Sequence, residues 1–433
     1  MFPFLNPSIS ESPLMFIIPF VWFSTLSFLL WRKHGGFDIS VYISLLYTFT
    51  SFLAMLLVAF DMLGDGGILY FSSDKGLDLV PTLLFCITIS LSILPFHLVY
   101  TRDIRNISCV SPFMFDAMSL FLILESMLNL YLVADSTLDI LSGDLAAIRD
   151  SVYAGDATPA MLKAESLGFI FRVFYYFNMA TLLCLPILFY NICFRHKPWW
   201  WNFLLFFASL SAPIAGIQSV DRTEMIYYAL MMVFCILFFW PQMSRRLRRK
   251  FLLFLLPFIA LGAVYVTVVS QARFEKQDGG AAVRNMQYTG QGYLNFCYFW
   301  NYANYDELTV ERIFPYYSNS VLKKSSSLTR REERSGQQGF FISVFPTFVG
   351  DIMLDISPIG MVLWVTCFAF IGLLLIRQSH RTQYDISEVL LIFTMACIPV
   401  FGIFYYRYFS LVYTYYIVLA LLYYGISRYR IRL

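Results

Sequence analysis

The fold class is decided by residues 221–273, DRTEMIYYALMMVFCILFFWPQMSRRLRRKFLLFLLPFIALGAVYVTVVSQAR. This stretch contains two apolar runs, at 223–241 and 251–270, with the basic segment RRLRRK at 245–250 between them. Each run has about the 20 residues that an α-helix needs to cross the hydrocarbon core of a bilayer. A cluster of Lys and Arg between two such runs is typical of a connection at a membrane surface. We therefore interpret the stretch as two transmembrane helices joined by a short basic connection.

The composition of the whole chain agrees with this interpretation. Of the 433 residues, 59% are hydrophobic and 14% are charged, whereas a soluble domain carries about 25% charged residues. We predict an all-α, polytopic membrane protein of about eleven transmembrane helices, folded as a single integral membrane domain over residues 1–433. The first apolar run lacks the features of a cleaved signal peptide, so we expect it to be retained as a helix. The eleven apolar runs cover approximately 14–31, 40–63, 81–101, 111–134, 168–192, 199–217, 223–241, 251–270, 357–376, 387–405 and 408–426.

Lys and Arg are distributed unevenly over the connections between these runs. One alternate set of connections, at 32–33, 102–105, 195–197, 245–250, 377–381 and 428–432, contains sixteen of them. The short connections of the opposite set contain five. The positive-inside rule assigns the richer set to the cytoplasm. We therefore expect the N-terminus outside, the C-terminus in the cytoplasm and an active site on the outer face.

The longest polar stretch, 271–340, lies on the outer side in this topology, and we expect a long outer loop that contains short helices. Its first part interleaves Arg273 and Arg284 with many aromatic residues, among which Tyr288, Tyr293 and Trp300 are candidate sugar-binding residues. Arginine binds phosphate oxygens in a bidentate manner. An anionic ligand that carries sugar rings would suit such a loop. The alternative, for 323–334 above all, is an ordinary solvated loop, because acidic residues accompany the basic ones.

The segment that follows this loop, FFISVFPTFVGDIMLDISPIG at 340–360, begins as an apolar run that Pro346 and Gly350 interrupt. Irregular backbone at membrane depth is tolerated where it lines a cavity or is buried in protein. We expect residues 340–356 to form a partly inserted outer segment that presents Asp351 to a cavity.

A tight outer turn, GIQSVDRTE at 216–224, places Asp221, Arg222 and Glu224 where two spans meet. Ionisable groups at membrane depth are costly unless they face water or one another. In one interpretation Arg222 and Glu224 neutralise each other. In the other, Arg222 holds a phosphate while Glu224 or Asp221 orients it or acts as a base. Arg407 lies at the outer surface as well, where it either snorkels to lipid headgroups or contacts the same anion.

Two further observations limit the chemistry. All four histidines lie in or toward cytoplasmic regions, so a carboxylate is the candidate general base of the outer face. The chain has no Walker loop, no HExxH and no GxSxG at a strand-to-helix turn, and its cysteines form no CxxC. We expect no metal and no cofactor. Within the spans, Arg172 and Glu125 are candidates for a buried structural pair.

Together these features resemble the Wzy-type oligosaccharide repeat-unit polymerases of O-antigen and capsule synthesis. The resemblance covers most of residues 199–380 and rests on GIQSVDRTEMIYYALMMVF, VVSQARFEK, the Arg- and Tyr-rich loop and FPTFVGDIMLDISPIGMVLW. Arg222 matches the turn arginine of the family, Arg273 and Arg284 match its loop arginines, and Asp351 matches the polar position after the loop. The related ligases use an outer-loop histidine, which this chain lacks, so the resemblance favours a polymerase.

The resemblance implies a GT-C-like helical bundle in the bacterial inner membrane. Its substrates would be undecaprenyl-diphosphate-linked oligosaccharides, and the growing chain would be transferred to a new lipid-linked unit without a metal ion. Beyond membrane lipids, a chain-length co-polymerase of the Wzz type is a candidate partner, and no nucleic acid is expected. Arg222, Arg273, Arg284 and Arg407 would bind the diphosphate. Glu224, Asp351 or Asp221 would provide the catalytic carboxylate.

A different class of function is also compatible with the sequence, namely a flippase or transporter of lipid-linked oligosaccharides. The same cations would then line a translocation path. Such a protein should carry cationic or polar residues throughout its spans, whereas here the cations concentrate at one face in the predicted topology. This distribution favours the enzyme.

Overall fold

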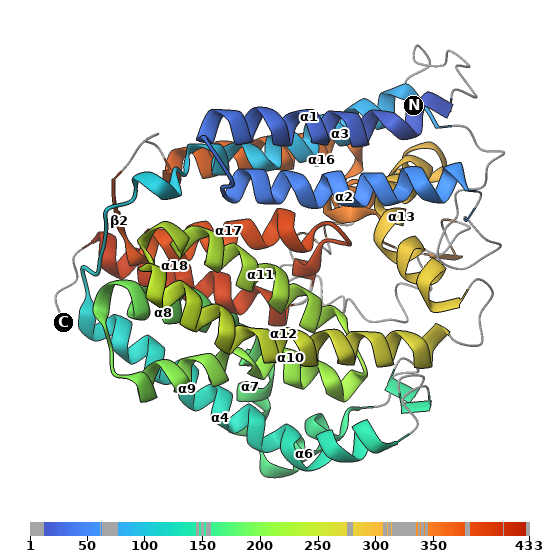
Figure 1. The fold of residues 1–433 in the computed structure, drawn as a ribbon. Coiled ribbons are helices and arrows are strands. Elements are labelled where there is room, and N and C mark those ends of the chain that lie inside the picture. Colours follow the sequence, from blue (N-terminus) through green and yellow to red (C-terminus); the bar gives the residue numbers. More distant parts are fainter. Residues whose placement is uncertain are drawn as a thin grey trace. The chain divides into compact units, whose positions relative to one another are not determined.

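The computed structural model of the protein describes most of its chain, and nearly all described residues are helical (Figure 1). Two short strands occur among them, β1 (Asn106–Ser108) and β2 (Gln383–Asp385), which pair in parallel. The prediction of an all-α fold is therefore confirmed. The described residues are 13–60, 62, 77–143, 147–148, 151–152, 157–274, 280–305, 310, 313, 335–336, 338, 342, 345–376, 382–409 and 411–429.

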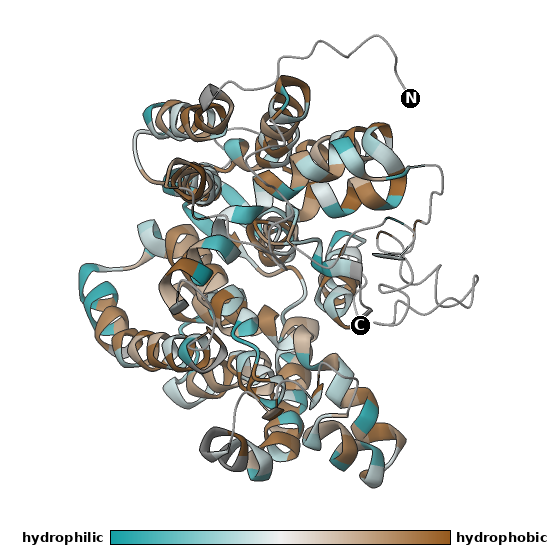
Figure 2. Cartoon of the chain, turned by 90° about the vertical axis from the view of Figure 1, so that its right-hand side faces the viewer, coloured by the Kyte–Doolittle hydropathy of each residue, from teal (hydrophilic) through white to brown (hydrophobic). Residues whose placement is uncertain are grey.

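Within this part of the chain, eight helical segments are long and apolar enough to cross a membrane. Hydrophobic residues predominate along the helices, as the brown colouring in Figure 2 shows. The protein is thus a polytopic membrane protein. The eight segments are Ile39–Ala59, Leu79–Asp103, Pro112–Thr137, Phe169–Arg195, Trp199–Ser219, Thr223–Gln242, Arg245–Gln271 and Thr347–Ile376.

Each of these eight segments overlaps a span that the sequence predicts. The three other predicted spans, at 14–31, 387–405 and 408–426, also overlap helices, namely α1 (Ile17–His34), α17 (Ile386–Phe401) and α18 (Tyr415–Arg428). These three helices do not belong to the set of long apolar segments. The count of eleven spans therefore stays a prediction.

The helices group into two compact units, each built from three separate stretches of chain. Unit 1 comprises Met1–Leu98, Ala282–Arg377 and Ile398–Phe409, and unit 2 comprises Val99–Ala281, Gln378–Cys397 and Ser410–Leu433. In both units, segments that are far apart in the sequence are needed to complete the packing.

Unit 1 contains α1, α2 (Ile39–Ala59), α3 (Leu79–Ile93), nearly all of α13 (Gly280–Tyr302), and α16 (Thr347–Ile376). Helix α1 packs along α2, and α3 packs against α16 (Figure 1). The turn between α1 and α2 has a clear local cause. Gly35 ends α1 in the left-handed conformation that glycine adopts without strain, and Asp38 accepts a hydrogen bond from the Ile39 N–H at the start of α2.

Helix α16 contains a break just before Pro358. Ile356 and Ser357 have non-helical φ/ψ values, and Pro358 follows them directly. Proline disfavours the helical conformation of the residue before it and cannot donate the next helical hydrogen bond. Before this break, Thr347–Asp355 form a helical stretch in which every side chain is buried. Gly350 lies inside that stretch and does not interrupt it.

Helix α13 corrects the expectation of short helices in a loop over 271–340. Residues 271–274 belong to the end of α12, and Gly280–Tyr302 form one helix of 23 residues. The glycines of α13 fit this packing. A Cβ atom on Gly290 would lie 2.9 Å from the Ala54 backbone nitrogen of α2, and a Cβ on Gly292 would lie 2.7 Å from Thr347 Cγ2. Close approach to neighbouring chain therefore explains two glycines that propensity alone would place outside a helix. Most of 306–340 lies outside the described residues.

Unit 2 is organised around α4, against which α6, α7, α9 and α10 pack. Helix α12 presents Leu253, Leu256 and Leu261 outward, each more than 60% exposed, as expected for a lipid-facing helix. The helices of unit 2 are α4 (Pro112–Ser142), α6 (Pro159–Leu167), α7 (Phe169–Phe177), α8 (Cys184–Tyr190), α9 (Trp199–Ser209), α10 (Ser211–Gly216), α11 (Thr223–Phe239), α12 (Arg245–Phe274) and α18, with most of α17.

Candidate functional site

The predicted site residues are divided between the two units. Each group is described below within its own unit. Asp221, Arg222, Glu224 and Arg273 belong to unit 2, whereas Arg284, Tyr288, Tyr293, Trp300, Asp351 and Arg407 belong to unit 1.

The turn before α11 has an unusual backbone conformation. Val220 has φ 49° and ψ 39°, the left-handed region that a β-branched residue rarely adopts. Such a conformation costs on the order of 1–3 kcal/mol. The Val220 side chain is buried with Ile140 of α4 and Val269 of α12, and burial of a valine contributes about 1.5–3 kcal/mol. Packing of Val220 thus offsets the strain and fixes the chain direction into the next two residues.

Arg222 directly precedes α11 and is 8% exposed. Its Nη1 atom donates a hydrogen bond to Ser270 Oγ on α12, and its guanidinium group lies 5.1 Å from the centre of the Phe274 ring. The N-terminal end of a helix carries a partial positive charge and has free N–H groups. A buried cation at this end of α11 favours a nearby negative charge, and Glu224 in the first turn is one such group.

Glu224 lies in the first turn of α11 and is 7% exposed. Its Oε1 atom accepts a hydrogen bond of 3.3 Å from the Tyr413 hydroxyl. Gly216 packs so closely that a Cβ atom there would lie 2.9 Å from Glu224 Cβ. The neighbouring carboxylate has a different role. Asp221 Oδ1 accepts a hydrogen bond of 2.8 Å from the Thr223 N–H, one of the N–H groups that the helix start leaves unpaired.

Arg273 lies in the last turn of α12, three residues after Ser270. Residues three apart in a helix share a face, so the backbone brings Arg273 to the side of α12 that contacts Arg222. The side chain of Arg273 lies outside the described residues.

In unit 1, Asp351 binds backbone. It is 2% exposed, and its Oδ2 atom accepts a hydrogen bond of 2.7 Å from the Tyr406 N–H. Two backbone bonds, from Thr347 N–H to Phe404 O and from Phe348 N–H to Gly402 O, both 2.9 Å, join the same two stretches of chain. Asp351 therefore contributes to holding the segment 402–406 against the start of α16.

Arg407 follows that segment and is 3% exposed, with its guanidinium group 5.3 Å from the centre of the Phe401 ring. A snorkelling arginine would extend its charged end to the surface. The burial of Arg407 instead indicates a cation held inside the protein.

Arg284 and the aromatic residues of α13 have different surroundings. Arg284 Nη1 donates to Gln287 Oε1 at 3.0 Å, and Gln287 in turn donates to Met62 O at 2.7 Å. Trp300 is partly exposed, and Tyr288 is partly exposed beside Phe345, with 5.4 Å between ring centres. Both aromatic rings retain surface that a ligand can contact.

Tyr293 is placed differently from the two other aromatic candidates. It is buried, and its hydroxyl is within 2.7 Å of Thr82 Oγ1 and donates to Met15 O at 3.1 Å. Its ring lies 5.3 Å from that of Phe85 on α3. Tyr293 therefore belongs to the packing of α13 against α3, and no face of its ring is open to a sugar.

Three residues of the Arg222–Glu224 cluster do not appear among the sequence predictions, namely Ser270, Phe274 and Tyr413. A signal for the first two existed, because both are close to Arg273 in the sequence and share its helix. Tyr413 lies 189 residues from Glu224, and no local pattern links them. No group of three or more His, Cys, Asp or Glu side chains that could hold a metal ion occurs among the described residues.

A comparison of the chain with known proteins finds no matching family model, no matching curated protein and no matching solved structure. A functional proposal for this protein accordingly rests on its own residues and contacts, together with the motif resemblance given above.

Proposed function

We propose that this protein is a metal-independent membrane glycosyltransferase that polymerises undecaprenyl-diphosphate-linked oligosaccharide repeat units. The observation that carries the proposal is the pair Arg222 and Glu224 at the start of α11. A buried cation and a buried carboxylate lie two residues apart at the positive end of a membrane-spanning helix. The motif resemblance supplies the substrate class, and this pair supplies the two kinds of group that the reaction requires.

In the proposed reaction, the bond between the anomeric carbon of the growing chain and its diphosphate oxygen breaks. The diphosphate leaves with the electron pair, and the anomeric carbon forms a new bond to a hydroxyl oxygen of the incoming unit. Arg222 neutralises the charge that develops on the diphosphate, because fixed cations contribute most where charge appears in the transition state. The acceptor hydroxyl passes its proton to a carboxylate that acts as general base.

Among the three candidate carboxylates, we assign the base to Glu224. Asp351 and Asp221 each accept a backbone N–H that fixes the local chain, at Tyr406 and Thr223 respectively. Glu224 instead accepts from the hydroxyl of Tyr413. Rotation of the Tyr413 side chain would let Glu224 Oε1 accept from a sugar hydroxyl instead, without disrupting backbone structure.

The remaining cations have supporting roles in the proposal. Arg273 lies on the same helix as Ser270 and provides a second positive charge for the diphosphate. Within unit 1, Arg284 and Arg407 remain candidate diphosphate contacts, and Tyr288 and Trp300 remain candidate sugar contacts.

The proposal also includes the topology. We place the protein in a bacterial inner membrane with eleven spans, the N-terminus in the periplasm and the C-terminus in the cytoplasm. Fusion of green fluorescent protein and of alkaline phosphatase to the C-terminus tests this arrangement. A fluorescent, phosphatase-inactive product is expected, and an active phosphatase at the C-terminus would reverse the orientation.

The decisive experiment removes the two groups separately in a strain that depends on this protein for its surface polysaccharide. Arg222→Ala and Glu224→Gln should each convert the ladder of long chains on a gel into single repeat units. Lys163→Ala, which removes an outlying cation of α6, is the matched control and should preserve the ladder. Full-length chains from both Arg222→Ala and Glu224→Gln, at equal membrane levels, would refute the assignment.

A second candidate, a flippase or transporter of the same glycolipids, is favoured by one observation. Buried polar side chains lie within the spans of unit 2, among them Glu125, Asn129, Asn178 and Gln218. Purified protein in vesicles that contain lipid-linked repeat units distinguishes the two functions. A polymerase makes joined chains, whereas a transporter moves single units between leaflets and joins none.

A further inference from the structure

Helix α4 contains a carboxyl group in an apolar part of the protein. Glu125 lies within Pro112–Thr137, a segment long and apolar enough to cross a membrane, and it is 0% exposed. An ionised carboxylate in such a place is very costly unless a cation pairs with it. Whether the Glu125 carboxyl group is charged therefore depends on the side chains around it.

The neighbours of Glu125 provide one hydrogen bond and leave two oxygens unsatisfied. Asn129, one turn further along α4, donates from Nδ2 to Glu125 Oε1 and also to the backbone oxygen of Phe174, at 3.0 Å in the second case. Glu125 Oε2 and Asn129 Oδ1 are both buried and have no hydrogen-bond partner within the described chain. Unsatisfied buried polar atoms are uncommon and indicate a missing partner.

No cation of the described residues compensates Glu125. Ion pairs within unit 2 include those of Lys163 with Asp135 and of both Arg195 and Lys197 with Asp116. Arg172, the partner that the sequence predicts, instead lies 5.9 Å from the centre of the Phe169 ring, so the predicted Arg172–Glu125 pair is absent. The neighbouring titratable side chain is the fully buried thiol of Cys184 on α8, which is uncharged as a thiol.

We propose that Glu125 is a proton-binding site inside unit 2, with the proton carried as a carboxylic acid. Binding of one proton from water converts the carboxylate into –COOH and removes the uncompensated charge. It also converts one carboxyl oxygen from an acceptor into a hydroxyl donor. Asn129 Oδ1 has no hydrogen-bond donor within the described chain. The hydroxyl of protonated Glu125 would be that donor.

The proton would stabilise a particular junction of helices. Phe174, whose backbone oxygen accepts from Asn129, lies in the last part of α7. Directly after α7 the chain forms the 3-10 helix η4 (Asn178–Leu183), and Asn178 accepts a hydrogen bond of 2.7 Å from Ser211. A 3-10 stretch between helices is a common place for a hinge. Loss of the proton would place a charge beside this junction and weaken it.

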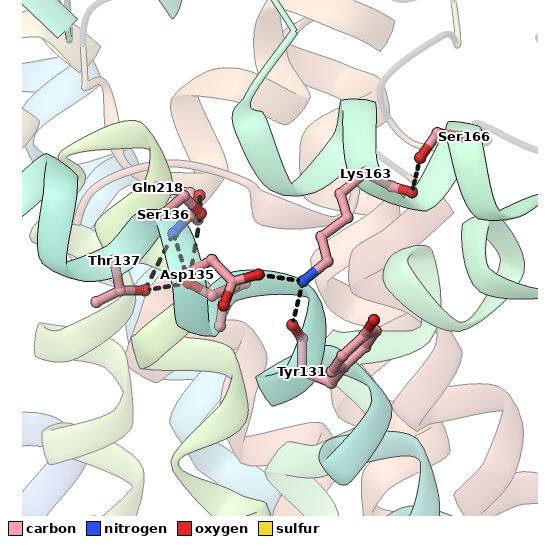
Figure 3. A network of polar contacts seen from close by, with 8 residues as sticks. Tyr131, Asp135, Ser136, Thr137, Lys163, Ser166 and Gln218 are labelled. Atoms are coloured by element: carbon pink, nitrogen blue, oxygen red, sulfur yellow. Dashed lines mark hydrogen bonds and ion pairs between the residues drawn. The ribbon is translucent and has the colours of Figure 1, made fainter.

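Further polar side chains of α4 lie between Glu125 and an exposed end of unit 2. Gln218 donates to the Val133 backbone oxygen at 3.4 Å and to Thr137 Oγ1 at 3.1 Å, and Ser136 donates to Gln218 at 2.8 Å (Figure 3). Asn129, Val133 and Thr137 are spaced by four residues and therefore share a face of the helix. Asp135, near this end of α4, forms an ion pair with Lys163, and its largely exposed side chain marks the end of the helix that solvent reaches. Polar groups thus occur along α4 from Asn129 to this exposed end.

Infrared spectroscopy of the full-length protein in lipid nanodiscs tests the proposal. At neutral pH the wild-type protein should show the C=O stretching band of a protonated carboxyl group, and Glu125→Gln should remove it. Glu165→Gln, which changes an exposed carboxylate of α6, is the control and should leave the band unchanged. A band that persists in Glu125→Gln, or is absent from the wild type, would overturn the proposal.

A stability measurement provides an independent test that needs no enzymatic activity. If the folded protein holds a proton that the unfolded chain releases, stability must fall as pH rises. The glutamine of Glu125→Gln cannot titrate, so the Tm of the wild type should decline relative to that of the variant between acidic and alkaline pH. Parallel Tm curves for the two proteins would show that Glu125 binds no proton on folding.

Discussion

The start of α11 in unit 2 and the start of α16 in unit 1 both bury a carboxylate, but the partners differ. Glu224 and Arg222 bond to side chains, at Tyr413 and Ser270. Asp351 bonds to the backbone of Tyr406, and one turn later Asp355 Oδ2 accepts from the Ile313 N–H at 3.1 Å. A side-chain partner can be exchanged for a substrate group, whereas a backbone partner holds the chain in place. The comparison separates a candidate reactive site from a structural one.

The largest effect is expected for Arg222→Ala, because it removes the cation of the candidate reactive site. Loss of one preorganised group that stabilises developing charge lowers a rate by about 100- to 1,000-fold. We expect this loss in polymerisation assays with purified protein, with a Tm close to that of the wild type. Arg222→Lys retains the charge without the bidentate geometry, so its rate should lie between those of the wild type and Arg222→Ala. If Arg222→Ala instead lowered Tm strongly without a specific loss of rate, the start of α11 would be structural, like the start of α16.

Asp351→Ala should have the opposite profile. A buried hydrogen bond to a charged group contributes about 1.5–3 kcal/mol, and we expect the free energy of unfolding to fall by that amount, with a lower Tm in detergent. Asp351→Asn can still accept from the Tyr406 N–H and should lose less. If Asp351→Ala instead kept its Tm and lost its activity, Asp351 would move from the structural to the reactive class.

Gly292→Ala tests how tightly the segment that Asp351 binds is packed. The added Cβ would lie 2.7 Å from Thr347 Cγ2 and 3.2 Å from Ile403 O, and overpacking of this kind costs about 1–3 kcal/mol. Gly425→Ala in α18 is the matched control, because nothing lies within 4 Å of its Cβ position. The control should be neutral or slightly stabilising, since alanine favours helix by about 1 kcal/mol over glycine. Equal Tm values for the two variants would contradict the close packing.

The smallest effect is expected for Tyr413→Phe. It removes one hydrogen bond to Glu224, worth about 0.5–1.5 kcal/mol net, and leaves the aromatic ring in place. Polymerisation should slow by a few-fold, because the carboxylate loses the group that orients it. A loss as large as that of Arg222→Ala would assign Tyr413 a direct part in the reaction.

The spans were predictable because their signal is local. A run of about 20 apolar residues is sufficient evidence for a membrane helix, and Pro358 marks the break in α16 because proline restricts the residue before it. Hydropathy did not predict helix α13, because its polar and aromatic residues pack against protein rather than lipid. Hydropathy alone does not distinguish such a helix from an aromatic loop.

The candidate site was predictable only in part. Arg222 and Glu224 stood out because charge is costly at the end of a span. Tyr413 could not be found, because it lies 189 residues from Glu224, whereas Ser270, 48 residues from Arg222, at least lies close to the predicted Arg273. For the same reason the backbone partner of Asp351, 55 residues away, was not foreseen, and a structural carboxylate resembled a catalytic one.

The assembly of both units from distant stretches has a consequence for synthesis on the ribosome. Unit 1 is complete only when Ile398–Phe409 has been made, and unit 2 only when the stretch from Ser410, the last of its three, has been made. The parallel ladder of β1 with β2 likewise joins Asn106 to Gln383. Helices that insert early therefore remain incompletely packed in the bilayer until the C-terminal stretches have been synthesised. A chain that stops after residue 377 lacks a part of each unit. A late nonsense mutation should therefore leave both units incomplete, and quality-control proteases should degrade the whole product.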